Sequence, residues 1–121
     1  MQIKSYKELI VWQKSIQFVK EIFILTSEFP KAELYGLVSQ LRRAAISIPS
    51  NIAEGNGRSS RKEYAYNLSI AYGSALECEP QLIIAKELKF VNEREYIKVE
   101  NLLNEILRML NSMRDKMRSG N

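Results

Sequence analysis

The sequence predicts an all-α protein, an up-down-up-down antiparallel four-helix bundle that is oligomeric. Apolar residues recur at steps of three and four through most of the 121 residues, which is the spacing of one helix face. Three of the periodic stretches begin with a capping pattern, and no stretch alternates apolar and polar residues as a strand would. Short connections favour antiparallel neighbours. We expect one domain over 1–121, with helices at about 6–28, 34–55, 61–89 and 93–118.

The first expected helix begins with Ser5 and Glu8, which are spaced for a capping box that satisfies two free backbone N–H groups. It ends ahead of Pro30, because the residue before a proline is disfavoured in helical geometry. Other apolar residues lie off the main stripe, so we expect burial on more than one side. The main stripe consists of Leu9, Trp12, Ile16, Val19 and Phe23.

The second expected helix contains Pro49, which removes one backbone hydrogen bond and costs about 3 kcal/mol in a helix interior. Either the helix kinks there or it stops and restarts. Ile52 keeps the register of the apolar stripe, which favours a kink. We expect Gly55 and Gly57 to supply the left-handed backbone conformation that ends a helix.

The third and fourth helices also begin with capping boxes. Ser60 and Glu63 cap the third helix, and Asn92 and Glu95 cap the fourth. Pro80 lies inside the third helix and should bend it. Each helix has a single apolar stripe of the kind found in bundles. The stripes are Tyr64, Leu68, Ala71, Ala75, Cys78, Leu82 and Ala85, and then Tyr96, Val99, Leu103, Ile106, Leu110, Met113 and Met117.

The sequence contains no histidine and a single cysteine, Cys78. Missing histidine removes Ser-His and Cys-His nucleophile pairs, the Glu-x-x-His ligands of di-iron bundles and mixed Cys/His zinc sites. We therefore expect no enzymatic activity, no cofactor and no metal. The lone cysteine, the lack of a signal peptide and the lack of a long apolar stretch predict a cytoplasmic protein with no membrane contact.

Two basic segments are candidates for contacts with nucleic-acid phosphates. The segment 41–64 has five cations against two carboxylates, and 108–118 has four against one, within a chain of net charge +4. Alternatively, the first is a solvated basic turn, and the second complements the dipole at a helix C-terminus. An up-down bundle places the turn between the second and third helices at the same end as the C-terminus, where we hypothesise that the basic patches merge. The candidate residues are Arg43, Arg58, Arg61, Lys62, Arg114, Lys116 and Arg118.

Arg42 points about 100° away from Arg43 on a helix and should serve another purpose. We expect it to pair with Glu77 or Glu79, across a helix or a subunit boundary. Several aromatic side chains could stack on bases, although aromatic residues at helical spacing belong more often to a core or an interface. These are Trp12, Tyr35, Tyr64, Tyr66 and Tyr72.

Much of the chain resembles the four-helix-bundle proteins encoded in intervening sequences of large ribosomal RNA genes. These are similar to the accessory variability protein of diversity-generating retroelements. The resemblance implies barrel-shaped homopentamers with no known enzymatic activity and with basic surfaces for RNA or DNA. It rests on VWQKS at 11–15, LTSEFP at 25–30, YGLVSQLRRAAISIPSNIAEGNGRSS at 35–60 and AYGSALE at 71–77.

Two functions are consistent with these observations. The first is a homo-oligomer that binds nucleic acid, with RNA favoured, through phosphate contacts without base-specific readout. The second is a structural or adaptor oligomer whose partner is another protein. Helices that are apolar on two faces favour oligomerisation in both cases, because one bundle interior cannot bury both faces. No small-molecule substrate is expected.

Overall fold

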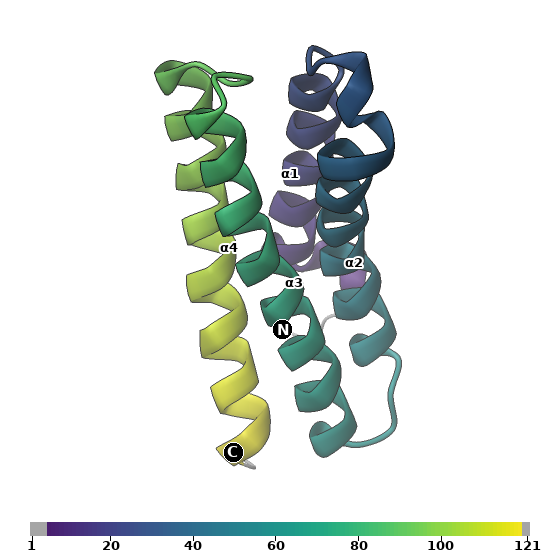
Figure 1. Cartoon of the computed structure of the whole chain (residues 1–121). Coiled ribbons are helices and arrows are strands. Elements are labelled where there is room, and N and C mark those ends of the chain that lie inside the picture. The colour runs from purple at the N-terminus through teal and green to yellow at the C-terminus, as the bar shows by residue number, and fades with distance from the viewer. Residues whose placement is uncertain (1–4, 120–121) are drawn as a thin grey trace.

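The computed structural model describes residues 5–119, which form four long helices and no strand. The helices run alternately in opposite directions, and α1 packs against both α2 and α4 (Figure 1). The predicted all-α four-helix bundle is therefore confirmed. Within the described part of the chain, no helix is long and apolar enough to cross a membrane. The helices are α1 (Ile10–Thr26), α2 (Ser39–Asn56), α3 (Arg61–Glu87) and α4 (Glu93–Ser119).

The predicted capping box at Ser5 exists, but it caps the N-terminus of a single 3-10 turn, Tyr6–Glu8, and not that of the first long helix. The backbone N–H of Ser5 donates to Glu8 Oε2 at 3.2 Å, and the N–H of Lys7 donates to Ser5 Oγ at 3.1 Å. Leu9 then adopts an extended conformation, with φ −72° and ψ 127°. The helix expected at 6–28 is thus interrupted at Leu9. Residues 1–4 and 120–121 of the predicted domain lie outside the described residues.

The connection between α1 and α2 consists of two irregular turns, a 3-10 turn at Lys31–Glu33 and a π-helical turn at Leu34–Val38. Gly36 has a non-helical backbone, with φ −112° and ψ −107°. Glycine reaches such conformations at low steric cost, so the regular helix starts only at Ser39. The predicted start near residue 34 was therefore several residues too early.

Both prolines are accommodated within continuous helices. α2 continues through Pro49, and α3 continues through Pro80. Ile52, one turn beyond Pro49, is fully buried, as expected for a helix that keeps its register. The helix therefore does not stop and restart at Pro49.

The prediction that Gly55 and Gly57 adopt a left-handed conformation was wrong. Gly57 is right-handed, with φ −87° and ψ −1°. Gly55 is buried and lies directly against Tyr64 and Asn67 of α3, where a side chain would not fit. Its small size, and not its backbone freedom, is what the fold requires. In the connection from α3 to α4 the left-handed residue is Lys89, with φ 66°.

The predicted stripes of α3 and α4 form the core. In α3 the residues from Leu68 to Ala85 on the stripe are buried, and Tyr64 is half-buried. In α4 the stripe is buried from Tyr96 to Leu110. Met113 and Met117 continue it as partly buried side chains against the core.

The predicted stripe of α1 is correct only in part. Leu9, Trp12 and Val19 pack against the core as partly buried side chains, but Phe23 is exposed and the most deeply buried face is a different one. Polar residues interrupt the true core face, and their side chains are satisfied within the helix. Ser15 Oγ donates to the carbonyl of Trp12 at 2.7 Å, and Thr26 Oγ1 donates to the carbonyl of Ile22 at 2.7 Å. Such local bonds remove the cost of burying a hydroxyl. The buried residues of α1 are Val11, Ser15, Phe18, Ile22, Leu25 and Thr26.

A row of polar side chains connects α2 to α3, and we call Ser47, Asn51, Asn67 and Ser74 the polar seam. Ser74 Oγ donates to Ser47 Oγ at 2.8 Å, and Asn51 Nδ2 donates to the same oxygen at 3.0 Å. Asn67 Nδ2 donates to Asn51 Oδ1 at 3.3 Å. The bonds from Ser74 to Ser47 and from Asn67 to Asn51 cross between the helices and need facing partners, so they fix the register of α2 along α3.

Candidate nucleic-acid interface

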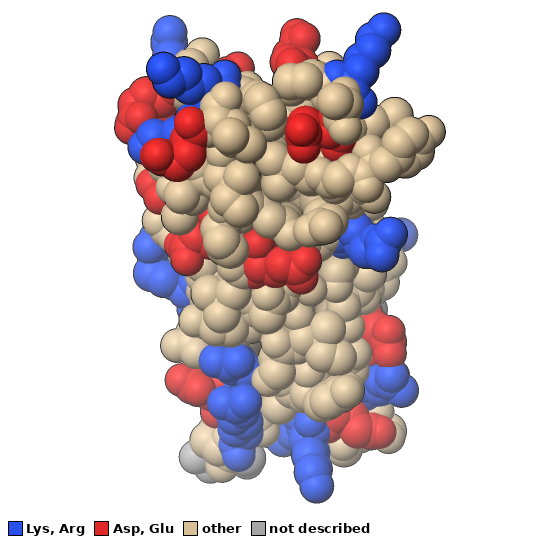
Figure 2. All heavy atoms as spheres, viewed as in Figure 1, with Lys and Arg blue, Asp and Glu red and all other residues tan. Residues whose placement is uncertain are grey.

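The α2–α3 turn and the C-terminal end of α4 lie at the same end of the bundle, the lower end in Figure 1. Arg61 Nη2 donates to the carbonyl of Lys116 at 2.9 Å, and Arg118 Nη2 donates to Ser69 Oγ at 3.2 Å. These contacts bring the two predicted basic segments together. Figure 2 shows blue side chains along this end, with some red ones beside them. We call its cations the basic end: Arg58, Arg61, Lys62, Arg114, Lys116 and Arg118.

Arg58 of the basic end is engaged by the protein itself. Arg58 forms an ion pair with Glu54, and its Nε donates to Asn67 Oδ1 at 3.2 Å. This extends the polar seam into the α2–α3 turn. Because Glu54 neutralises its charge locally, Arg58 is a weaker candidate for a phosphate contact than the sequence suggested.

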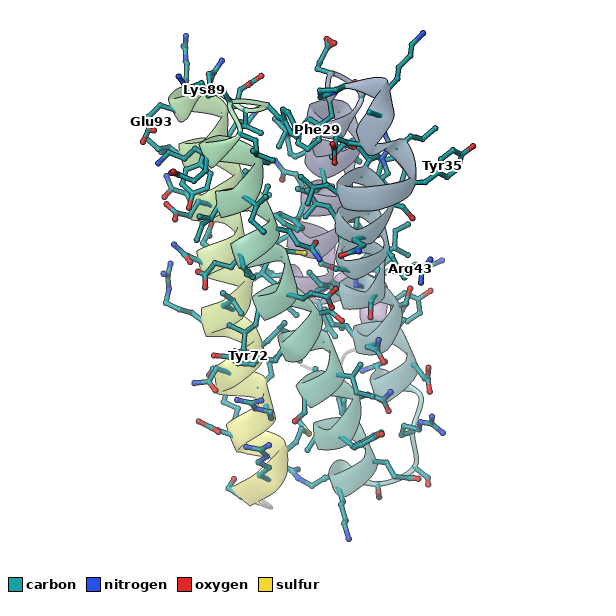
Figure 3. All side chains as sticks on the ribbon, in the orientation of Figure 1. Phe29, Tyr35, Arg43, Tyr72, Lys89 and Glu93 are labelled. Atoms are coloured by element: carbon teal, nitrogen blue, oxygen red, sulfur yellow. The ribbon has the colours of Figure 1, made fainter. Side chains whose placement is uncertain are left out.

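Arg114 is held in a similar way on α4. Its Nη2 donates to Asn111 Oδ1 at 2.8 Å. Its guanidinium lies 4.3 Å from the ring centroid of Tyr72, which Figure 3 labels on α3 beside α4. A guanidinium over an aromatic face at this distance is a cation–π contact. Arg114 therefore contributes to the contact between α3 and α4.

Lys62 and Lys116 have exposed side chains, and neither takes part in an ion pair within residues 5–119. Arg118 is also exposed, and its guanidinium reaches the hydroxyl of Ser69. The ammonium groups of Lys62 and Lys116 are flexible point charges that suit phosphate oxygens in many geometries. The basic end can thus attract a phosphate backbone without reading its sequence.

The structure does not bring Arg43 to the basic end. Arg43 lies on the exposed side of α2, twelve residues before Gly55, which corresponds to about 18 Å of helix axis. Figure 3 shows it well above the α2–α3 turn. It lines a separate surface cavity with Tyr35 and Ile46.

Arg42 contacts α1 and not the carboxylates of α3. Its Nε donates to Thr26 Oγ1 at 2.8 Å, and its guanidinium lies 4.5 Å from the ring centroid of Phe23. Within residues 5–119 it has no ion pair with Glu77 or Glu79, so the expected pairing inside one chain was wrong. Pairing across a subunit boundary stays a prediction.

The aromatic candidates divide into two groups. Trp12, Tyr64 and Tyr72 are partly buried against the core, as expected of aromatic residues at helical spacing. Tyr35 and Tyr66 are exposed, with 92% and 67% of their surface accessible. Tyr35 projects outward from the bundle, on the side of α2 (Figure 3).

Sequence reasoning missed a cavity of about 450 Å³ at the basic end, between the first turns of α3 and the last turns of α4. Tyr66 and Lys62, one helical turn apart, form part of its wall. That spacing was visible in the sequence, but the contribution of α4 was not, because it depends on how the two helices pack. The lining residues are Lys62, Ala65, Tyr66, Ser69, Met117 and Arg118.

Cys78 lies in the core and away from the basic end. Burial, with a smaller contribution from the charge of Glu77, raises the pKa of its thiol to about 12. Since the thiolate is the reactive form, Cys78 is chemically inert in the folded protein at neutral pH. Among residues 5–119, no three cysteine or carboxylate side chains gather in a way that could hold a metal ion.

Comparison with known proteins gives a match to the family model described as 23S rRNA-intervening sequence protein, over residues 7–112. The chain is also similar to the crystal structure of a protein with unknown function from the S23 ribosomal protein family, from Bacteroides thetaiotaomicron. The TM-score is 0.80 at 27% identity, and the match covers 86% of this chain and 97% of that chain. No curated protein matches the sequence. The family match contains Lys62 and Tyr66 but ends before Lys116 and Arg118.

Proposed function

Since the chain belongs to the 23S rRNA-intervening sequence protein family, we propose that it is a non-enzymatic homo-oligomer that binds nucleic acid through phosphate contacts. RNA is the favoured ligand, and DNA is the alternative that the experiment below includes. The observation that carries this proposal is the basic end, where two cationic segments from distant parts of the sequence meet.

The chemistry of the basic end favours backbone binding over base-specific readout. Lys62 and Lys116 are exposed point charges, and a phosphate that meets them releases its condensed counterions. Base-specific readout relies on bidentate side chains placed at base edges. Arg58 and Arg114 could serve in that way, but their guanidinium groups are held by Glu54 and Tyr72.

Exposed apolar side chains support the oligomeric part of the proposal. They occur on α1, α3 and α4, outside the core that the four helices share. Copies of the chain that pack against one another would cover them. The pentameric state is taken from the resemblance to the family. The aliphatic residues with the largest exposed fractions on these helices are Ile10, Ile24, Leu76, Ile83, Ile84 and Ile97.

A second function is favoured by Tyr35, which is 92% exposed beside Leu34 and Ile46. Exposed tyrosine next to aliphatic side chains is typical of an anchor residue in a protein–protein contact. Under this alternative the protein is a structural or adaptor oligomer for another protein, and the basic end serves solubility.

The discriminating experiment is fluorescence anisotropy of labelled RNA and duplex DNA at low and physiological salt, with the oligomer mass measured in the same buffer. We expect affinity for RNA to fall steeply with salt, since each phosphate contact contributes to the slope. An intact oligomer that binds neither nucleic acid at low salt would reject the nucleic-acid function. The adaptor function would then be tested by capture of protein partners, with Tyr35→Ala as the control.

A further inference from the structure

The cavity of the basic end combines an aromatic wall with cations. Tyr66 is 67% exposed and lies one turn along α3 from Lys62. Ala65 and Met117 supply apolar surface, and Arg118 closes the α4 side. The volume of about 450 Å³ falls within the range of small-molecule sites, which is about 300–1,000 Å³. An aromatic face, an apolar floor and two cations together match the parts of a nucleotide.

We propose that this cavity holds an unpaired nucleotide, with the base stacked on the ring of Tyr66 and the flanking phosphates contacted by Lys62 and Arg118. The proposal rests on the nucleic-acid function above and adds the kind of nucleic acid. Single-stranded RNA, or the loop of a folded RNA, is bound in preference to a duplex.

The hydrogen bond from Arg118 to Ser69 gives this arrangement its geometry. Arg118 comes from the last turns of α4, and the bond at 3.2 Å holds its guanidinium against α3. Tyr66 and Ser69 are three residues apart on α3, so they lie on neighbouring positions of one helix face. The cation is thereby kept near the tyrosine ring. A base on the ring would have its phosphate within reach of a positive charge on either side.

The preference for unpaired nucleotides follows from whether the face of the base is accessible to an aromatic side chain. In a duplex the faces of each base are covered by its neighbours, and a side chain can stack only after the base is flipped out. Unpaired loops and single strands present those faces directly, and aromatic residues bind them with little dependence on sequence. Phosphate contacts alone would not distinguish single strands from duplexes in this way.

Two exposed tyrosines allow a matched comparison. Tyr35 also lies near arginines, Arg42 and Arg43, but in a different cavity on α2. It is more exposed than Tyr66 and makes an internal control for the loss of a surface aromatic ring. Tyr66→Phe keeps the ring and removes only the hydroxyl, so it separates stacking from hydrogen bonding.

The test uses the full chain, a short labelled single-stranded RNA of mixed sequence, and the blunt duplex that it forms with its complement. We expect wild-type protein to bind the single strand about tenfold more tightly, and Tyr66→Ala to lose about tenfold for the single strand and little for the duplex. Tyr66→Phe and Tyr35→Ala should bind as wild type does. The oligomer mass is measured for every variant.

Four results would overturn the proposal. Equal affinity for both RNAs with no effect of Tyr66→Ala would remove the base site while leaving backbone binding in place. A loss caused by Tyr35→Ala and not by Tyr66→Ala would move the site to α2. A smaller mass for Tyr66→Ala would assign Tyr66 to contact with a second copy of the chain. Wild-type protein that binds neither RNA would reject the nucleic-acid function itself.

Discussion

Gly55 of α2 lies so close to Tyr64 of α3 that a Cβ added at residue 55 would be 2.8 Å from the Cδ1 atom of that ring. The same Cβ would be 2.8 Å from the Cβ of Asn67, an atom fixed by the backbone of α3. A clash with such an atom cannot be relieved by rotating a side chain. The two helices can therefore approach this closely only because residue 55 has no side chain.

Gly55→Ala should lower the free energy of unfolding by about 1–3 kcal/mol, because overpacking forces neighbouring groups apart. The measurement is denaturation by urea at equilibrium. Gly73 provides the control, since a Cβ there meets nothing within 4 Å. Gly73→Ala should raise the free energy of unfolding by about 0.5–1 kcal/mol, as expected of alanine in an exposed helix. Equal effects of the two substitutions would contradict the close approach at Gly55.

Arg42→Ala should lower the free energy of unfolding by about 1–2 kcal/mol. The substitution removes a hydrogen bond to Thr26 and a cation–π contact with Phe23, both of which tie α2 to α1. Arg43→Ala removes a neighbouring exposed arginine and should change stability by less than about 0.5 kcal/mol. Thermal unfolding of both variants makes the comparison. A larger effect of Arg43→Ala would show that the assignment of the two arginines is reversed.

Stability should fall as pH rises above about 9. Burial raises the pKa of Cys78 from 9.0 to about 12. For Tyr96, burial and a hydrogen bond of its hydroxyl to Glu100 raise the pKa from 10.0 to about 12. Each group keeps its proton in the folded state after the unfolded state has lost it. Their contribution is complete below the unfolded-state pKa and is lost as pH rises toward the folded-state pKa.

Urea denaturation from neutral pH to about pH 11 tests this linkage. Cys78→Ala and Tyr96→Phe should each be less stable than wild type at neutral pH, yet should lose less stability as pH rises. If the stability of both variants declined with pH as steeply as that of wild type, other groups would be the cause of the lower stability at high pH.

Lys62→Ala combined with Lys116→Ala should reduce the slope of log affinity for RNA against log salt by about 1–2, because each lysine accounts for roughly one phosphate contact. Lys20→Ala combined with Lys31→Ala removes the same charge from α1 and the α1–α2 connection, away from the basic end. That double variant should retain the wild-type slope. An equal decrease in both would show that net charge, and not the basic end, determines binding.

The sequence predicted the features that depend on one helix at a time. The cap of α4 forms as expected, with the N–H of Glu95 donating to Asn92 Oδ1 at 2.8 Å and the N–H of Asn92 donating to Glu95 Oε1 at 3.1 Å. The stripe of α4 was also correct, because its polar and apolar residues are well separated around the helix. The α2–α3 turn and the C-terminal end of α4 lie at one end of the bundle, as the connectivity alone predicted.

Features that depend on contacts between helices were not predicted. The core face of α1 includes Ser15, whose hydroxyl is satisfied by its own helix, so the apolar stripe on that face is interrupted in the sequence. The partner of Arg42 is Thr26 because α2 packs on α1 at one particular register. Glu54 of α2 holds Arg58, which lies just past the end of that helix, and no charge count could distinguish Arg58 from a free cation.

The polar seam has a consequence for the opening motions of the bundle. If α2 slid along α3, the bonds from Ser74 to Ser47 and from Asn67 to Asn51 would break together, and the buried amide of Asn67 would lose its acceptor on α2. Local openings that break the contact between α2 and α3 are therefore costly, and the two helices form one cooperative unit. In hydrogen exchange, the amides in the middle of both helices should exchange at a common, slow rate.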